Sequence, residues 1–116
     1  MPPTILLVDD TDAVRELCAD VLIAAGFRVL PAASVERALW EIERSPAPID
    51  VLLSDVTMPG QSGLDFAHAL KARWPRLHVL LMSGSELDAP VSFPFLPKPF
   101  SPATLVSRIR ELLRGA

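Results

Sequence analysis

Four short, mostly apolar runs in this chain each end at polar residues that can bind phosphate or a divalent cation. Residues 5–8 precede Asp9 and Asp10, residues 51–54 precede Asp55, residues 79–82 precede Ser83, and residues 95–97 precede Lys98. In an open parallel sheet, ligands bind beyond the carboxyl ends of the strands, where such residues come together. A single strand ending in Asp would mean little, because Asp also starts turns and caps helices. The recurrence predicts one pocket built from four strand ends.

The segments between these runs have the pattern of amphipathic helices. Apolar residues recur at helical spacing over residues 14–22, 35–42, 66–74 and 105–113. In the first two stripes the residues expected to face inward are Val14, Leu17, Cys18, Val21 and Leu22, then Val35, Ala38, Leu39 and Ile42. Strands alternating with helices predict an α/β fold, in which a parallel sheet is covered by helices on both faces.

Several residues mark where these elements begin and end. Gly26 can terminate the first helix, and Ser34 can cap the second. Ser101, followed by Pro102, predicts the start of the last helix. Proline cannot donate a ladder hydrogen bond, so Pro97 places the last strand at an edge of the sheet.

Length and composition predict one small domain in the cytoplasm. A chain of 116 residues can bury one core, so we expect residues 1–116 to form a single domain without an effector domain. No apolar run approaches the roughly 20 residues that span a bilayer, and no basic leader opens the chain. The net charge of -3, with scattered basic residues, argues against direct binding of nucleic acid. Cys18 is the single cysteine, which excludes an internal disulfide and a cysteine-rich metal site.

The residues at the strand ends predict chemistry on phosphate. Carboxylates as close as Asp9, Asp10 and Asp55 would be there raise one another's pKa unless a cation compensates. Mg²⁺ suits such a site, because it takes hard oxygen ligands from carboxylates and phosphate. Lys98 adds a compact positive charge, and Ser83 adds a hydroxyl donor. Together these groups predict a site for phosphoryl transfer.

The same residues resemble the receiver domain of two-component response regulators. The matching features, within residues 5–113, are the acidic pair Asp9-Asp10, Asp55, Met58-Pro59-Gly60, Gly63, Ser83 and Lys98-Pro99. The resemblance implies a flavodoxin-like, doubly wound sheet of five parallel strands in the order 2-1-3-4-5. It also implies a phosphorylation-activated switch that signals by protein contacts, and that catalyses only its own phosphorylation and slow dephosphorylation.

The resemblance implies a role for each site residue. Asp55 would accept the phosphoryl group from a phosphohistidine on a sensor histidine kinase or a histidine phosphotransfer protein. Mg²⁺, with Mn²⁺ as a substitute, would be bound by Asp10 and Asp55 directly, by Asp9 largely through water, and by the backbone carbonyl of Thr57.

The remaining implied roles concern the response to phosphorylation. Ser83 would close on the phosphoryl group and Lys98 would pair with its oxygens. Phe95 occupies the position of the switch aromatic, and a cis bond is implied between Lys98 and Pro99.

The chain departs from the family between Ser83 and Lys98. Receivers have a helix of several turns there, but residues 84–97 must also supply the fifth strand, and Pro90 and Pro94 reduce the space. Proline inside a helix costs about 3 kcal/mol. We therefore expect a short or absent fourth helix, without the usual dimer face, and a loop over residues 84–93 that phosphorylation orders.

Two alternatives come from other classes of protein. Asp10 and Asp12 fit the Asp-x-Asp pattern of haloacid-dehalogenase-like phosphatases, with Asp10 as nucleophile and Asp12 as general acid and base. These phosphatases need a later acidic pair for Mg²⁺, and only Glu111 follows Lys98. The other alternative is a pseudo-receiver that binds a partner without being phosphorylated. The intact set of three aspartates argues against it.

Overall fold

The structure, a computed structural model, describes residues 2–84 and 93–115. The strands of the main sheet are β1 (Thr4–Val8), β2 (Arg28–Ala32), β3 (Val51–Asp55), β6 (His78–Ser83) and β7 (Phe95–Pro97), and β4 (Thr57–Met58) and β5 (Gln61–Ser62) form a separate hairpin. The helices are α1 (Asp12–Ala24), α2 (Val35–Arg44), α3 (Gly63–Arg73) and α4 (Pro102–Arg114).

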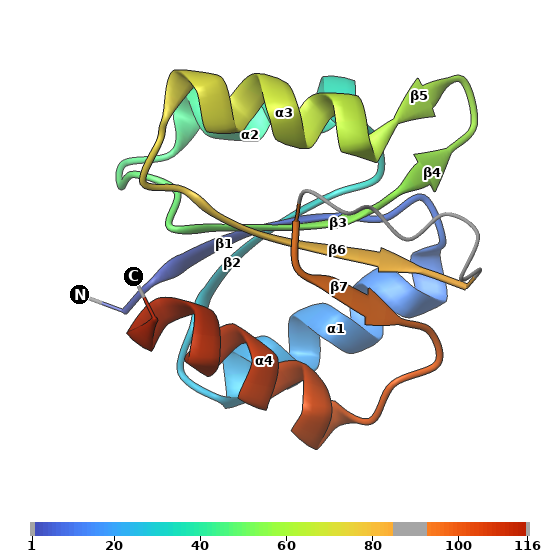
Figure 1. Ribbon diagram of the computed structural model, residues 1–116, viewed down its shortest axis with the longest axis vertical. Helices are drawn as coiled ribbons and strands as arrows, with labels where there is room; N and C mark the ends of the chain where they lie inside the picture. The colour runs from blue at the N-terminus through green and yellow to red at the C-terminus, as the bar shows by residue number, and fades with distance from the viewer. Residues whose placement is uncertain (1, 85–92, 116) are drawn as a thin grey trace.

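The main sheet has the predicted topology. Its strands are all parallel and follow the order β2-β1-β3-β6-β7, which is the expected order 2-1-3-4-5 (Figure 1). β7, which contains Pro97, lies at an edge as predicted. The carboxyl ends of β1 and β3 are neighbours, because Val8 pairs with Ser54.

Helices cover both faces of the sheet, and each face buries its own core. α2 and α3 lie on one face and α1 and α4 on the other (Figure 1). Leu6 and Val8 of β1 point toward α2 and α3, whereas Ile5 and Leu7 join Cys18 and the core beneath α1 and α4. Because both faces are buried, the central strands are apolar without alternation.

The predicted helix ends are confirmed. The Ser34 hydroxyl accepts the Arg37 N–H at 3.0 Å, and the Ser101 hydroxyl accepts the Thr104 N–H at 3.1 Å. Gly26 follows α1 with a φ of +97°, a left-handed conformation that costs glycine little.

The prediction that Leu17 and Leu39 face inward is wrong. Leu17 is 59% exposed and Leu39 is 43% exposed. Leu17 directly precedes the buried Cys18, and Leu39 directly follows the buried Ala38. Consecutive residues of a helix point about 100° apart. Both leucines therefore lie at the margin of the apolar stripe, where the sheet no longer covers them.

The expected shortening of the helix between β6 and β7 concerns residues 85–92, which lie outside the described residues. The described ranges hold four helices, in agreement with that expectation. The proposed loop over residues 84–93 falls almost entirely on the same segment.

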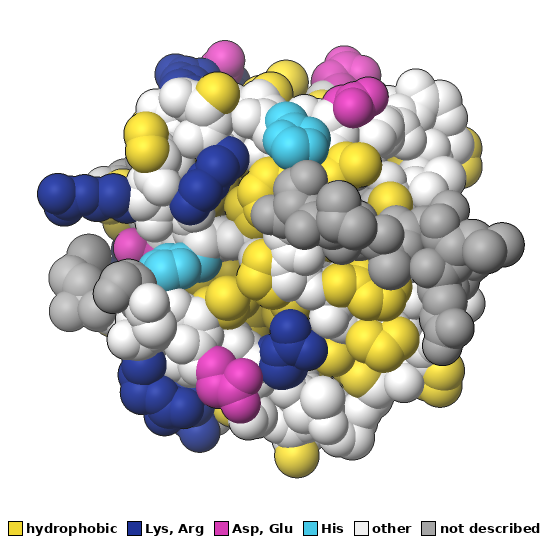
Figure 2. Space-filling view, in the orientation of Figure 1, with side chains coloured by type: hydrophobic (Ala, Val, Ile, Leu, Met, Phe, Trp, Pro, Cys, Tyr) yellow, Lys and Arg dark blue, Asp and Glu magenta, His cyan; other side chains and the backbone are white. Residues whose placement is uncertain are grey.

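One face of the molecule carries charged side chains of both signs (Figure 2). On the face drawn in Figure 2, Lys and Arg side chains are interspersed with Asp and Glu. Within residues 2–84 and 93–115, no helix has the length and apolarity needed to cross a membrane.

The hairpin of β4 and β5 was not predicted. Thr57 pairs with Ser62 and Met58 with Gln61, and Gly60 supplies the turn with a φ of +71°. The Ser62 hydroxyl then caps α3 by accepting the Asp65 N–H at 3.1 Å. The signal for this hairpin was the Pro59-Gly60 dipeptide, which is typical of a turn.

Gly63, the first residue of α3, packs directly against the backbone of β3. A Cβ atom at this position would lie 1.7 Å from the carbonyl oxygen of Asp55, and the Gly63 N–H donates to the Val56 carbonyl at 2.7 Å. Only glycine permits this approach. The start of α3 is thereby held against the end of β3.

We expect Gly63→Ala to destabilise the fold by about 2 kcal/mol, because overpacking against backbone typically costs 1–3 kcal/mol. A loss of stability in Gly63→Ala is informative, because replacing glycine by alanine inside a helix otherwise increases stability. Urea unfolding followed by circular dichroism measures the effect. Gly84→Ala is the matched control, because a Cβ atom there meets nothing within 4 Å among the described residues. Equal stability of the two variants would contradict the close approach.

Candidate functional site

Three carboxylates meet at the carboxyl ends of β1 and β3. One oxygen from each of Asp9, Asp10 and Asp55 lies within 4.8 Å of the others. Asp9 is fully buried, Asp55 is half-buried and Asp10 is exposed, so the cluster opens to solvent on one side. Three hard oxygen donors with access to solvent fit the requirements of Mg²⁺, which retains several waters.

Lys98 brings a positive charge into this cluster. Its ammonium Nζ lies 2.8 Å from Oδ2 of Asp9 and 3.4 Å from Oδ2 of Asp55. The peptide bond from Lys98 to Pro99 is cis, as the resemblance implied. Lys98 therefore neutralises part of the negative charge that the three carboxylates concentrate at the sheet edge.

Both carboxylate oxygens of Asp9 are engaged. Oδ2 accepts from Lys98, and Oδ1 accepts the Thr11 N–H at 2.8 Å. A fully buried carboxylate needs such partners, because an unpaired buried charge is very costly. Asp9 is thus fixed from two sides, whereas Asp10 is exposed.

The electrostatics of the site follow from partial burial. Burial raises the pKa of Asp55; the charge of Lys98 opposes this effect and the charge of Asp9 adds to it. Burial alone would lower the pKa of Lys98, but the hydrogen bond and charge of Asp9, together with Asp55, outweigh it and raise that pKa. The carboxylates therefore hold Lys98 in its charged form.

Ser83 and Phe95 lie on the strands next to this cluster. Ser83 ends β6, is 4% exposed, and accepts the Lys98 N–H on its carbonyl oxygen at 2.8 Å. Phe95 pairs in register with Leu81 and packs against the core beneath α2 and α3. Thr57 begins β4 two residues after Asp55 and is exposed. The fold thus brings the predicted residues to one end of the sheet.

Two contacts that support the site were not predicted from the sequence. Gly63, identified in the sequence only as a feature shared with the receiver family, packs under the Asp55 carbonyl. Arg15 donates to the backbone carbonyl of Asp9 at 2.8 Å. A contact between a side chain and a backbone six residues away leaves no periodic signal in the sequence.

Asp10 and Asp12, the nucleophile and the general acid and base of the phosphatase alternative, are not arranged as a catalytic pair. The side chain of Asp12 is 80% exposed in the first turn of α1 and forms an ion pair with Arg15 at 2.5 Å. Asp10 instead lies with Asp9 and Asp55. This arrangement does not favour the phosphatase reading.

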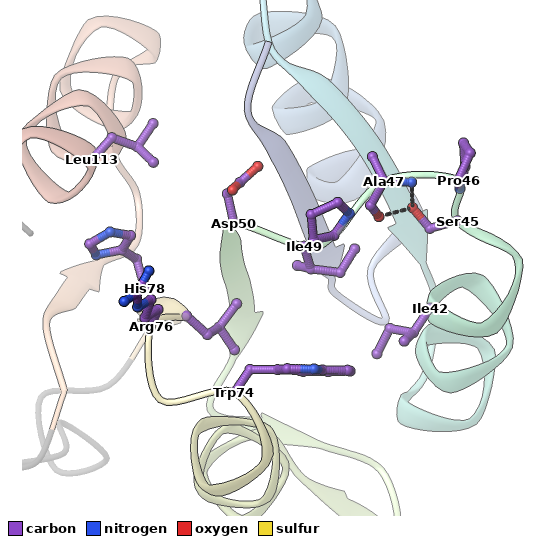
Figure 3. Close-up of a pocket in the computed structure, with 12 residues that line it drawn as sticks. Ile42, Ser45, Pro46, Ala47, Ile49, Asp50, Trp74, Arg76, His78 and Leu113 are labelled. Carbon is purple, nitrogen blue, oxygen red and sulfur yellow. Dashed lines mark hydrogen bonds between the residues drawn. The ribbon is translucent and has the colours of Figure 1, made fainter. Parts of the chain in front are cut away.

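A hollow of about 520 Å³ lies at the opposite end of the sheet (Figure 3). It is lined by Ile42, Ile49 and Trp74, and its polar residues include Asp50 and His78. Asp50 already accepts the Thr4 N–H at 2.8 Å. The residues that line this hollow include neither the three clustered aspartates nor Lys98, so the hollow is separate from the candidate site.

Comparison with known proteins agrees with this geometry. The model of the response regulator receiver domain family matches residues 5–110. The chain is 40% identical over 116 residues to the transcriptional regulatory protein CpxR of Escherichia coli (strain K12), covering 95% of this chain and 49% of that protein. It is 36% identical over 117 residues to the sensor kinase CckA of Brucella abortus (strain 2308), covering 95% of this chain and 12% of that protein. The chain thus spans half or less of these relatives.

Solved structures show the same fold. The receiver domain of the hybrid histidine kinase CckA superposes with a TM-score of 0.82 at 39% identity, covering 95% of this chain and 98% of that one. The chemotaxis protein CheY4 of Vibrio cholerae superposes with a TM-score of 0.84 at 26% identity, covering 97% and 99%. With the family model spanning most of the chain, these likenesses show that it belongs to the response regulator receiver domain family, the phosphoacceptor switches of two-component systems.

Proposed function

We propose that this receiver accepts a phosphoryl group on Asp55 in a Mg²⁺-dependent reaction. The observation that carries the proposal is the grouping of Asp9, Asp10 and Asp55 within 4.8 Å, with the Lys98 ammonium at 2.8 Å from Asp9 and 3.4 Å from Asp55. Asp55 is the half-buried member and lies at the end of a central strand. It therefore combines access for a donor with a rigid position.

Asp10 and Asp55 would bind the metal directly, Asp9 largely through water, and the Thr57 carbonyl would complete the protein ligands. When bound, Mg²⁺ offsets the repulsion between the carboxylates and the negative charge of the incoming phosphoryl group. The two engaged oxygens of Asp9 support its indirect role, since Lys98 and the Thr11 N–H already occupy them.

In the proposed step, a carboxylate oxygen of Asp55 forms a bond to phosphorus while the bond from phosphorus to the donor's imidazole nitrogen breaks. The electron pair of that bond remains on the imidazole, which takes up a proton. Lys98 then pairs with the phosphoryl oxygens, and the Ser83 hydroxyl closes on them. Phe95 follows Ser83 inward as the switch aromatic.

The donor would be a sensor histidine kinase or a histidine phosphotransfer protein. Beside Lys98, an apolar hollow of about 420 Å³ is lined by Val14, Leu17, Cys18 and Phe100, among other residues. Leu17 is 59% exposed there, so an apolar side chain at the hollow is accessible to a partner. We propose that a donor protein docks on this hollow and so brings its phosphohistidine to Asp55.

The phosphoacceptor is tested by Asp55→Asn, which keeps the shape but removes the nucleophile. With Mg²⁺ and acetyl phosphate, wild type should gain one acid-stable, base-labile phosphate in intact-mass spectra, and the variant none. Asp65→Asn, an exposed carboxylate in the first turn of α3, should behave as wild type. A stoichiometric adduct on Asp55→Asn would refute the assignment.

The metal site is tested by thermal unfolding. At about 100 times its dissociation constant, a ligand of the folded state adds about 2.7 kcal/mol, so saturating Mg²⁺ should raise the melting temperature by several degrees. Asp10→Asn should abolish the rise, and Asp20→Asn, an exposed residue of α1, should keep it. Lys98→Met should show a larger rise than wild type, because the cation that Mg²⁺ competes with is gone. No rise in wild type would contradict the site.

The donor surface is tested by Leu17→Glu. Phosphotransfer from a purified histidine kinase that phosphorylates wild type should slow about tenfold, because a charge replaces a buried apolar contact. Phosphorylation by acetyl phosphate should be unchanged. Ile23→Glu, at a position that is 57% exposed on the same helix, is the control and should transfer normally. Equal transfer rates for both variants would place the donor elsewhere.

A further inference from the structure

Arg15 of α1 reaches back to the turn that carries the acidic pair. Its Nη1 donates to the backbone carbonyl oxygen of Asp9 at 2.8 Å, and its side chain is only 16% exposed. That oxygen belongs to the peptide unit joining Asp9 to Asp10. The orientation of this peptide sets the directions in which both carboxylates leave the backbone.

A second contact orients the guanidinium itself. Its Nη2 lies 2.5 Å from Oδ1 of Asp12, and the Arg15 N–H donates to the Thr11 carbonyl at 2.9 Å. The Thr11 N–H in turn donates to the Asp9 carboxylate. A planar guanidinium can hold two acceptors in fixed directions, which an ammonium cannot do. The turn from Asp9 to Asp12 is therefore bound at both ends by one side chain.

The exposed ion pair alone does not explain this arrangement. The Asp12 side chain is 80% exposed, and exposed ion pairs contribute little to stability. The partly buried contact of Arg15 is the one to the Asp9 carbonyl, next to the carboxylate cluster. Asp12 thus serves to aim the guanidinium at that carbonyl.

We propose that Arg15 is a positioning residue that orients Asp9 and Asp10 for binding a divalent cation. This inference rests on the proposed metal-dependent function, because it concerns how the same carboxylates are held. Groups that orient metal ligands typically contribute 10- to 100-fold to metal affinity. Arg15 acts through the backbone and contacts none of the reacting atoms.

Two effects of removing Arg15 have opposite signs. Arg15 carries a positive charge close to the acidic cluster, so by Coulomb's law its loss should strengthen binding of a cation. If Arg15 orients the carboxylates, its loss should weaken that binding. The direction of the change therefore separates positioning from bulk electrostatics, and a purely structural role would not weaken metal binding by the folded protein.

The test measures Mn²⁺ binding by the electron paramagnetic resonance signal of free Mn²⁺, which does not depend on phosphorylation. We expect Arg15→Met to bind Mn²⁺ at least about tenfold more weakly than wild type. Arg37→Met is the matched control, since Arg37 forms an ion pair with Glu41 on α2 and its loss changes the net charge equally. It should bind at least as tightly as wild type.

Arg15→Lys keeps the charge but can hold only one acceptor, so its affinity should fall between those of wild type and Arg15→Met. Circular dichroism checks that each variant is folded. Affinity of folded Arg15→Met equal to or above that of wild type overturns the inference. If Arg15→Met does not fold, Arg15→Lys decides: a loss of about threefold or more supports positioning, and wild-type affinity overturns it. Failure of wild type itself to bind Mn²⁺ would instead refute the proposed metal site.

Discussion

The ion pair between Lys98 and Asp9 is the interaction on which the rest of this site depends. It joins groups at the ends of β1 and β7, which are separated in the sheet by β3 and β6. Asp9 is fully buried, and removing one partner of a buried pair typically costs about 3–5 kcal/mol, because the other charge is left uncompensated. The contact thus ties the residue that follows β7 to the buried carboxylate that follows β1.

Because Lys98 pairs with two of the three carboxylates, Asp9 and Asp55, its single charge leaves the cluster with excess negative charge. Burial raises the pKa of Asp55, and the charges of Asp9 and Asp10 add to this effect while Lys98 opposes it. A divalent cation would offset the repulsion between the carboxylates and leave Lys98 available for a phosphoryl group. With such a cation bound, as proposed, the site would no longer repel a phosphoryl group, which is anionic like the carboxylates.

Much of the fold could be predicted because it depends on local patterns. Unbroken apolar strands indicated a sheet buried on both faces, Pro97 indicated the edge strand, and Ser34 and Ser101 indicated helix starts. Leu17 was misplaced because helical periodicity specifies a stripe but not how far the sheet extends beneath it. The β4–β5 hairpin was missed because two-residue strands carry no periodic signal.

The order of residue types along the chain determined, by itself, the α/β fold, the edge position of the last strand and the presence of acidic residues and a lysine at strand ends; the full strand order followed from the family resemblance. Only the tertiary structure decided that Lys98 pairs with Asp9 at 2.8 Å, that Gly63 must lack a side chain beneath Asp55, and that Arg15 holds the Asp9 carbonyl. The physical reason is that strand patterns follow from each residue's own preference for burial. These contacts instead depend on distances and directions between segments, which exist only once the strands have packed.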